Sequence, residues 1–352
     1  MTVPLYESSF TEVERPLLET AHLSVTGFRY PSGVAALRIT VGRAEAVVLP
    51  FRGQQVWRYL VDGEDLTMRT HFDAPARSTE FAETYGAFLL HCGLTGIGHP
   101  EPHDDHAHHG ELPNASYDTA YLAWGTTPEG PWVGVGGACR LRSTHSVDVT
   151  FEPRLILPSH EPLVDLDLRI SNHRTTPFAY SYLCHINWNL IDGARLEQPL
   201  DVDSDAFTLD LPDTDGPSAD YFTRIAADPR ASNTLAADRL IAPEYVAIMK
   251  PRADIDGLAH CLMVRPDGRA AAVSYEVAHL PHALRWISHT TDEMAAGFCL
   301  PTTAHHRGRS AAEADGLMRH VPAGGDVQMR IRLALLDPST AAERLASVTA
   351  TS

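Results

Sequence analysis

Apolar and polar residues alternate along most of this chain, which is the pattern of strands with one buried and one exposed face. The clearest run is 163–170, in which Val, Leu and Ile occupy every second position and Asp or Arg lies between them. Turn-forming residues at 171–177 separate it from a second run at 178–188. We expect these two runs to pair as a hairpin of an antiparallel sheet.

The same short alternating runs recur from the first 50 residues to the last 30. Many such strands separated by Pro, Gly and Asp indicate a mainly β fold, a large antiparallel β-sandwich. We expect one domain over residues 1–352, with short helices at Ala341–Ala350 and Pro229–Leu240 and a surface excursion at Leu200–Asp220. The further predicted strands are Val34–Val41, Ala46–Leu49, Val56–Leu60, Ala87–Leu90, Ala120–Trp124, Val147–Phe151, Tyr245–Met249, Ala271–Val277 and Val327–Leu335.

Composition narrows the partners and the compartment. The 352 residues carry a formal net charge of −17, which argues against nucleic acid and anionic membranes as partners. No apolar run approaches the roughly 20 residues that span a bilayer, and the first 14 residues lack a basic signal-peptide region. The five cysteines are far apart and form no CxxC, which is typical of buried free thiols in the cytoplasm. The oligomeric state is not defined, and a homodimer stays open.

The segment 89–115 is the most unusual part of the sequence. It contains histidines at 99, 103, 106, 108 and 109 among many glycines and prolines, which indicates a long ordered loop. If Gly110 lies in an extended strand, His109 and Glu111 face the same way into one cleft. An imidazole and a carboxylate together suit sugar hydroxyls or a metal ion.

Three further places offer candidate chemistry. His185 and Asn187 share one face of the predicted strand at 178–188, so His185 is a candidate acid–base group. Trp286 is a candidate stacking platform for the apolar face of a sugar. His305 follows a strand and is expected to reach the same cleft, and Arg52 precedes a glycine where its guanidinium can bind hydroxyl or carboxylate oxygens. The ordinary alternatives are a core histidine, a core tryptophan and a surface ion pair.

In these residues the sequence resembles the aldose 1-epimerase (galactose mutarotase-like) superfamily. Three blocks carry the resemblance: the pair His109-Gly110 after a long loop, the set Asn172, Pro177, His185, Asn187 and Asn189, and Trp286 followed by 297–301. The order of motifs is most similar to the DUF4432 branch, which shares the run Leu-Leu-x-Cys-Gly-Leu at 89–94 and the run beginning at His109-Gly110. The resemblance covers roughly residues 25 to 335.

The resemblance implies a β-sandwich with a sugar cleft and no required cofactor. It implies that His185 protonates the ring oxygen, that His109 binds the sugar, and that a C-terminal glutamate removes the anomeric proton. This chain has Leu300-Pro301 where that glutamate is expected, and neither residue can accept a proton. Glu111 is the first candidate for a replacement base and Glu293 the second.

We therefore predict a sugar isomerase or epimerase with aldose 1-epimerase-like acid–base chemistry on a small carbohydrate. One alternative is a metal-dependent sugar or keto-sugar isomerase, epimerase or lyase. Its divalent Zn, Mn, Fe or Ni would be held by His109, Glu111, His185 and His305. Another alternative is a non-catalytic carbohydrate-binding protein, to which the missing glutamate points. The sequence does not name the sugar.

Overall fold

The protein is mainly β, as the alternation predicted. A computed structural model describes residues 1–351; strands make up about 47% of it and helices about 11%. By its contacts the chain divides into two compact units, each built from discontinuous segments. Unit 1 comprises Met1–Thr67, Phe72–Cys184 and Thr303–Arg330, and unit 2 comprises Met68–His71, His185–Thr302 and Ile331–Ser352. The expectation of a single domain stays a prediction.

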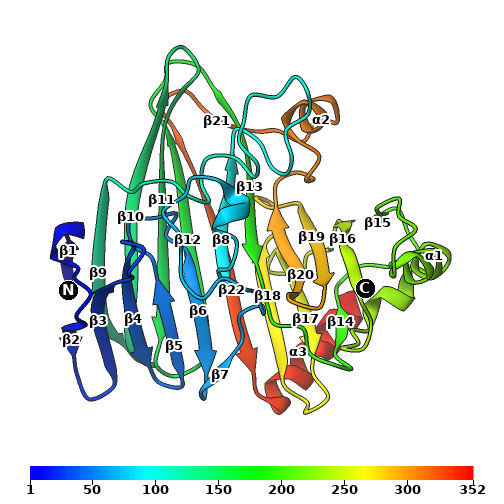
Figure 1. The fold of residues 1–352 in the computed structure, drawn as a ribbon, viewed down its shortest axis with the longest axis horizontal. Helices are drawn as coiled ribbons and strands as arrows, with labels where there is room; N and C mark the ends of the chain where they lie inside the picture. The colour runs from blue at the N-terminus through cyan, green and yellow to red at the C-terminus, as the bar shows by residue number, and fades with distance from the viewer. Residues whose placement is uncertain (352) are drawn as a thin grey trace. The chain divides into compact units, whose positions relative to one another are not determined.

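Unit 1 is an antiparallel sandwich of two layers (Figure 1). The strands of one layer follow the order β1 (Thr2–Leu5), β9 (Thr119–Thr127), β10 (Gly130–Ser143), β11 (Val147–Pro158) and β12 (Leu163–Asn172). The strands of the other follow the order β13 (Phe178–Ile186), β8 (Leu89–Leu94), β6 (Val56–Val61), β5 (Ala44–Val48), β4 (Ala35–Val41), β3 (Leu23–Arg29) and β2 (Arg15–Glu19). Short strands β7 (Glu64–Asp65) and β21 (Arg319–Val321) pair with β6 and β13.

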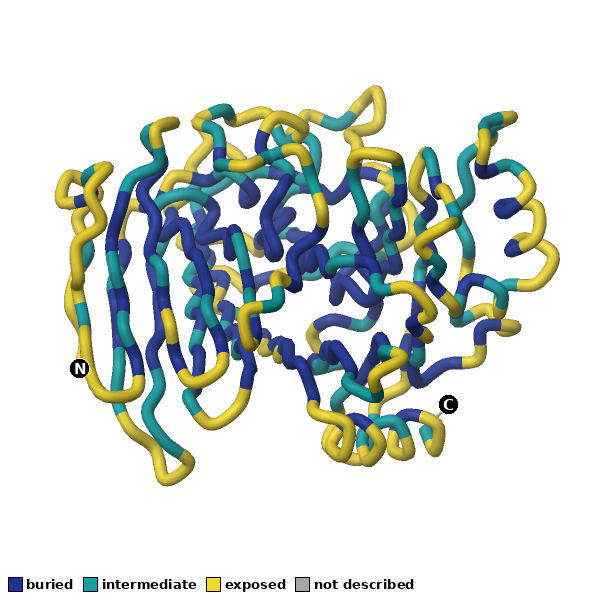
Figure 2. The backbone as a smooth tube through the Cα atoms, turned by 60° about the horizontal axis from the view of Figure 1, so that its bottom comes forward, coloured by how far each residue is buried: buried dark blue, intermediate teal, exposed yellow. Residues whose placement is uncertain are grey.

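Side chains from both layers fill the core of unit 1. Phe151 of β11 contacts Tyr182 of β13 and His91 of β8, with ring centroids 6.0 and 5.2 Å apart. His91 is fully buried and its Nδ1 lies 2.8 Å from the Tyr182 hydroxyl, so it serves the core. Figure 2 shows the strand centres buried and the connecting turns exposed, the arrangement that alternating sequences produce.

Unit 2 also contains two sets of antiparallel strands. One set has the order β18 (Ala270–Glu276), β17 (Leu258–Val264), β14 (Arg195–Glu197), with the end of β22 (Asp326–Leu336) beside β18. The other has the order β15 (Phe207–Asp210), β16 (Ile241–Met249), β19 (His282–His289), β20 (Met294–Thr302). Its helices are α1 (Ala219–Ala227), the 3-10 turn Pro229–Asn233 and α3 (Pro338–Thr351). Unit 1 contributes α2 (Arg309–Ala314) and 3-10 turns at Glu7–Ser9 and Phe81–Glu83.

The predicted hairpin between 163–170 and 178–188 is wrong. β12 pairs with β11, whereas β13 belongs to the other layer of unit 1, next to β8. The connection at 173–177 carries the chain between the layers. Asn172 stabilises it, because its amide nitrogen donates to the carbonyls of Thr176 (2.9 Å) and Val321 (3.2 Å). Alternation identifies a strand but not its partner.

The helix expectations were partly right. Helix α3 covers the predicted range 341–350. The predicted helix at 229–240 is only a 3-10 turn, Pro229–Asn233, capped by the Asp228 side chain and followed by extended backbone at Thr234. Helix α1 begins inside the range that was expected to be a surface excursion and continues to Ala227, with Tyr221, Phe222 and Ile225 buried.

All five cysteines are buried free thiols, as expected. Among residues 1–351, none of the helices is both long and apolar enough to cross a membrane.

Candidate functional site

Unit 2 brings together three of the predicted site residues. The Nδ1 atom of His185 lies 2.8 Å from the side-chain oxygen of Asn187, and its ring meets Trp286 edge to face, with centroids 5.4 Å apart at 71°. His185 and Asn187 are buried, whereas Trp286 is partly exposed. The predicted common face of His185 and Asn187 is therefore the side on which they contact each other.

Asn187 determines the proton position on His185. A carboxamide oxygen only accepts hydrogen bonds, so Nδ1 carries the hydrogen of the neutral ring and Nε2 carries the lone pair. A histidine held in one tautomer and one orientation is prepared for proton transfer at its other nitrogen. This pairing is a local consequence of the sequence, because the two residues are two positions apart.

The strand ends hold this cluster in place. β13 ends at Ile186, and Trp188 then forms an isolated antiparallel bridge with Ala296 of β20. The Asn187 carbonyl accepts the Met68 backbone N–H at 2.8 Å. Trp286 pairs in register with Gly297, where an added Cβ would lie 3.4 Å from the indole. A side chain at position 297 would therefore crowd the indole and the Leu300 side chain, whose Cδ2 would lie 3.2 Å from the added Cβ.

Arg52 in unit 1 carries hydrogen-bond donors that the protein leaves unused. Its Nε and Nη2 atoms are buried and make no hydrogen bond within residues 1–351. Burial, followed by repulsion from Arg77, lowers the pKa of Arg52. Unpaired buried donors cost free energy, so a ligand oxygen beside this guanidinium would bind favourably. The backbone of Arg52 bridges to Ser116, next to the end of the histidine-rich loop.

Gly110 does not lie in an extended strand, so the condition under which His109 and Glu111 would share one face is not met. Both His109 (φ 59°) and Gly110 (φ 76°) adopt left-handed backbone. The cause is that the backbone at Gly93, in the run 89–94, passes close to the backbone at Gly110, in the run that begins at His109. A Cβ on Gly110 would lie 2.4 Å from the Gly93 carbonyl oxygen, and Gly93 donates its N–H to the His109 carbonyl (2.7 Å). A larger residue at Gly110 would force these two backbones apart, and one at Gly93 would collide with the Ser181 carbonyl oxygen of β13, 2.3 Å from the added Cβ.

Glu111 is held by Thr95, whose backbone N–H (3.1 Å) and hydroxyl both donate to its carboxylate. Its carboxylate still has lone pairs for a further donor. Glu111 also lines an open pocket of about 180 Å³ together with Phe81, His108 and Asn114. Glu293 lies at the turn between β19 and β20, where it pairs with His71 (2.9 Å). Leu300 and Pro301 are buried in β20.

Most of the loop histidines pack against one another. His108 stacks between His99 (centroids 3.8 Å apart) and His109 (4.6 Å), and Phe81 contacts both His108 and His109 at 4.8 and 4.7 Å. Burial, together with the neighbouring His99 and His106, lowers the pKa of His108 to about 4. The stacked ring of His108 is therefore neutral near pH 7, which suits a packed aromatic group.

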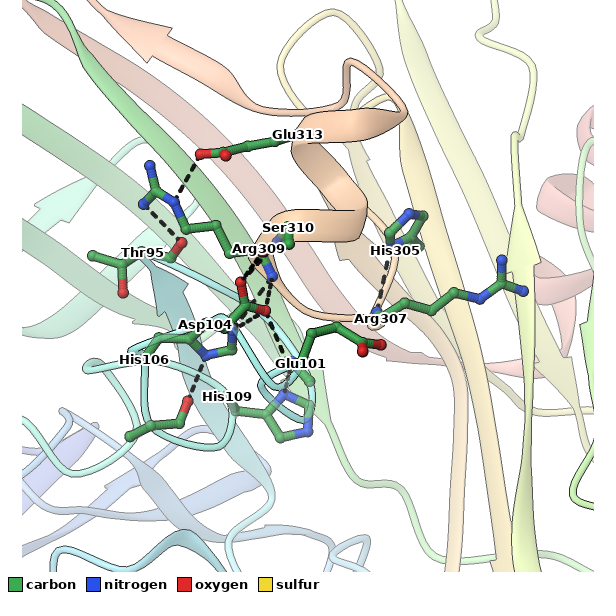
Figure 3. Close-up of polar contacts among 12 residues, drawn as sticks. Thr95, Glu101, Asp104, His106, His109, His305, Arg307, Arg309, Ser310 and Glu313 are labelled. Atoms are coloured by element: carbon green, nitrogen blue, oxygen red, sulfur yellow. Dashed lines mark hydrogen bonds and ion pairs between the residues drawn. The ribbon is translucent and has the colours of Figure 1, made fainter.

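Asp104 ties the same loop to the start of α2 (Figure 3). Its carboxylate accepts the backbone N–H groups of Glu101 (3.0 Å), Arg309 (2.9 Å) and Ser310 (2.9 Å) and the Ser310 hydroxyl. Burial would raise the pKa of Asp104, but these hydrogen bonds outweigh it and lower the pKa to about 2. Beside it, His106 Nε2 accepts the Arg309 N–H at 3.3 Å. No local signal in the sequence indicated the contact between Asp104 and Arg309, which are 205 residues apart.

His305 has both ring nitrogens engaged. Nδ1 accepts the Arg307 N–H at 3.3 Å, so Nε2 carries the hydrogen and lies 3.1 Å from Asp315. This neutral ring has no free lone pair for a metal. Within residues 1–351, no three His, Cys, Asp or Glu side chains are grouped to hold a metal ion. The geometry therefore adds no support to the metal set that includes His109 and Glu111, which remains a prediction.

The fold is similar to that of several solved structures. A putative aldose 1-epimerase from Klebsiella pneumoniae superposes with a TM-score of 0.84 at 16% identity, covering 100% of this chain and 95% of that one. A galactose mutarotase-like protein from Clostridium acetobutylicum has a TM-score of 0.59 at 11% identity, with 90% and 100% covered. A galactose 1-epimerase from Lactobacillus acidophilus has a TM-score of 0.51 at 12% identity, with 90% and 99% covered. At these identities the likeness establishes the galactose mutarotase-like sandwich fold.

No curated protein sequence matches the chain. A family model described as a domain of unknown function, DUF4432, matches residues 31–335, most of the chain. The chain therefore belongs to the DUF4432 family, as its motif order indicated.

Proposed function

We propose that this protein is a sugar isomerase or epimerase that acts on a small carbohydrate by aldose 1-epimerase-like acid–base chemistry. The observation that carries the proposal is the cluster of His185, Asn187 and Trp286 in unit 2. It combines a histidine of fixed tautomer with a partly exposed indole, the two kinds of group that proton transfer to a sugar and stacking on its apolar face need.

His185 is the proposed acid. In its protonated form it donates the Nε2 proton to the ring oxygen while a base takes the proton of the anomeric hydroxyl. The bond from C1 to the ring oxygen breaks and a carbonyl forms at C1; rotation about C1–C2 and the reverse steps give the other anomer. Trp286 would stack on the sugar and Asn187 would keep the imidazole in position.

Unit 1 holds the other residues predicted for the reaction, and each is a candidate by its own surroundings. Arg52 has unused donors that suit sugar oxygens, and His109 and His305 are the sugar contacts proposed from the sequence. Glu111 is the proposed base, because Thr95 orients its carboxylate and it lines a pocket. Leu300 and Pro301 occupy the position where the resemblance implies a glutamate, and neither can accept a proton, which favours one other function, carbohydrate binding without catalysis.

Polarimetry separates these functions. An anomerically pure aldose, such as α-D-galactose or α-D-glucose, should equilibrate faster with the protein than without it, and a chelator should leave the rate unchanged. Loss of the acceleration on chelation, and its recovery with Zn, Mn, Fe or Ni, would instead support the metal-dependent alternative. Saturable sugar binding with no acceleration would indicate the non-catalytic function.

A further inference from the structure

Arg285 of β19 is a fully buried cation without an acidic partner. Its Nη1 donates to Asn233 Oδ1 (2.9 Å) and to the Ser232 hydroxyl (3.1 Å), and its Nη2 donates to Gln198 Oε1 (2.6 Å). The guanidinium also lies 5.1 Å from the ring centroid of Phe207. Within residues 1–351 no carboxylate forms an ion pair with Arg285, and its Nε has no hydrogen-bond partner. Buried charges are normally paired, so this one stands out.

Arg285 fixes how two carboxamides face their surroundings. Asn233 and Gln198 both present their oxygens to the guanidinium, so their amide nitrogens point away from it. Both residues line an open pocket of about 510 Å³ in unit 2. The Asn233 amide nitrogen donates no hydrogen bond within the described part of the chain. A hydrogen-bond donor, backed by a positive charge, is thus set in the pocket wall.

A second arginine at this pocket also lacks an acid. Arg252 is exposed, lines the pocket, and has only the Thr351 carbonyl oxygen, at 3.4 Å, as a partner for its guanidinium within residues 1–351. Arg230 lines the pocket too, but Asp203 (2.5 Å) neutralises it. Among the residues that the structure describes, Arg252 and Arg285 thus both lack a carboxylate partner, although the chain as a whole is strongly acidic, with a net charge of −17. An anion in the pocket would balance both.

We propose that this pocket binds the carboxylate or phosphate group of a small metabolite, between the Arg252 guanidinium and the Asn233 amide. Arg285 acts as a positioning residue. It orients the carboxamides of Asn233 and Gln198 and adds positive charge behind them. Two acidic side chains at the pocket, Glu197 and Asp201, limit its net positive charge, which suits one carboxylate or phosphate monoester better than a polyphosphate.

This anion site is separate from the proposed sugar site. Arg285 and Trp286 are neighbours on β19, so their side chains leave the strand on opposite faces. The His185 cluster lies on the Trp286 side and the anion site on the Arg285 side. The proposal therefore does not depend on the proposed isomerase activity.

Isothermal titration calorimetry with inorganic phosphate, D-glucuronate and neutral D-glucose tests the proposal. We expect saturable binding of phosphate or glucuronate, and which of the two binds identifies the preferred anion. Arg252→Ala should weaken that binding about tenfold or more, because a charge-assisted contact is lost. Arg330→Ala, which removes an exposed arginine of unit 1 that pairs with Asp167, is the matched control and should leave binding unchanged. Failure of both anions to bind, or equal binding by Arg252→Ala, would overturn the proposal.

Asn233→Asp gives a second and opposite readout. The aspartate keeps an acceptor for Arg285 and adds the missing countercharge, so the melting temperature should rise by roughly 2 °C or more. The same change replaces the donor in the pocket wall with a negative oxygen, so anion binding should disappear. A variant that is destabilised, or that is folded and still binds the anion, would contradict the assignment of Asn233 and Arg285.

Discussion

The His185 cluster of unit 2 and the histidine-rich loop of unit 1 use the same side chain in different ways. His185 has one partner that sets its tautomer, Asn187, and one aromatic neighbour, Trp286. In the loop, the rings of His99, His108 and His109 stack on one another, and His106 accepts a backbone N–H of α2. A high density of histidines therefore indicates neither a metal site nor a catalytic site by itself. The environment of each ring decides its role.

The largest effect is expected from His185→Ala. If His185 transfers the proton, the rate of mutarotation should fall by two to four decades with folding intact. His103→Ala, which removes an exposed loop histidine, should change the rate less than about twofold. Polarimetry measures both rates and circular dichroism checks the fold. If both variants lost the same fraction of the mutarotation rate, the His185 cluster and the histidine-rich loop would not differ in their role.

Glu111→Gln tests the side chain of the loop to which we assign proton abstraction. The amide keeps an oxygen for the Thr95 donors but cannot accept a proton, so the rate should fall about a hundredfold. Thr95→Val is the control, since it removes the hydroxyl donor and leaves the carboxylate. If Glu111→Gln keeps the full mutarotation rate but has a lower melting temperature, Glu111 stabilises the loop and does not take part in proton transfer.

Asp104→Asn should affect stability and not rate. Charge-assisted hydrogen bonds to Arg309 and Ser310 are weakened, and we expect the free energy of unfolding at pH 7 to fall by about 2 kcal/mol. The pKa of Asp104 is lowered from 3.8 to about 2 in the folded protein. Its contribution is therefore complete above about pH 4 and is lost as the pH falls towards 2.

Urea unfolding of the wild type between pH 5 and pH 2 should consequently show an acid-dependent loss that is about 2 kcal/mol larger than in Asp104→Asn. Parallel curves for the two proteins would mean that the loop is anchored to α2 by other contacts. If Asp104→Asn changed the mutarotation rate at pH 7, this part of the loop would also contribute to the reaction.

The smallest effect is expected from Asn187→Ala. Losing the acceptor for Nδ1 frees the imidazole to change tautomer, so the mutarotation rate should fall about tenfold. Asn187→Asp retains an acceptor oxygen and should keep more activity than the alanine variant. If both variants lose the same activity, Asn187 acts through packing and not through the ring of His185.

The sequence by itself determined the strands, because alternation is a local property with a period of two residues. It also gave the pairing of His185 with Asn187, which are neighbours on one face. It missed Arg285, although an arginine between Leu284 and Trp286 in a strand rich in apolar residues was a usable signal.

The tertiary structure decided which strands pair, and this is why β12 and β13 lie in different layers despite their short connection. It decided the left-handed turn at Gly110, since the Gly93 backbone approaches it from another strand. It also decided that Asp104 meets α2 and that Arg285 is buried without an acid. Each of these features joins residues far apart in the chain, and their contacts leave no periodic trace in the local sequence. Only the folded chain brings such groups within hydrogen-bonding distance.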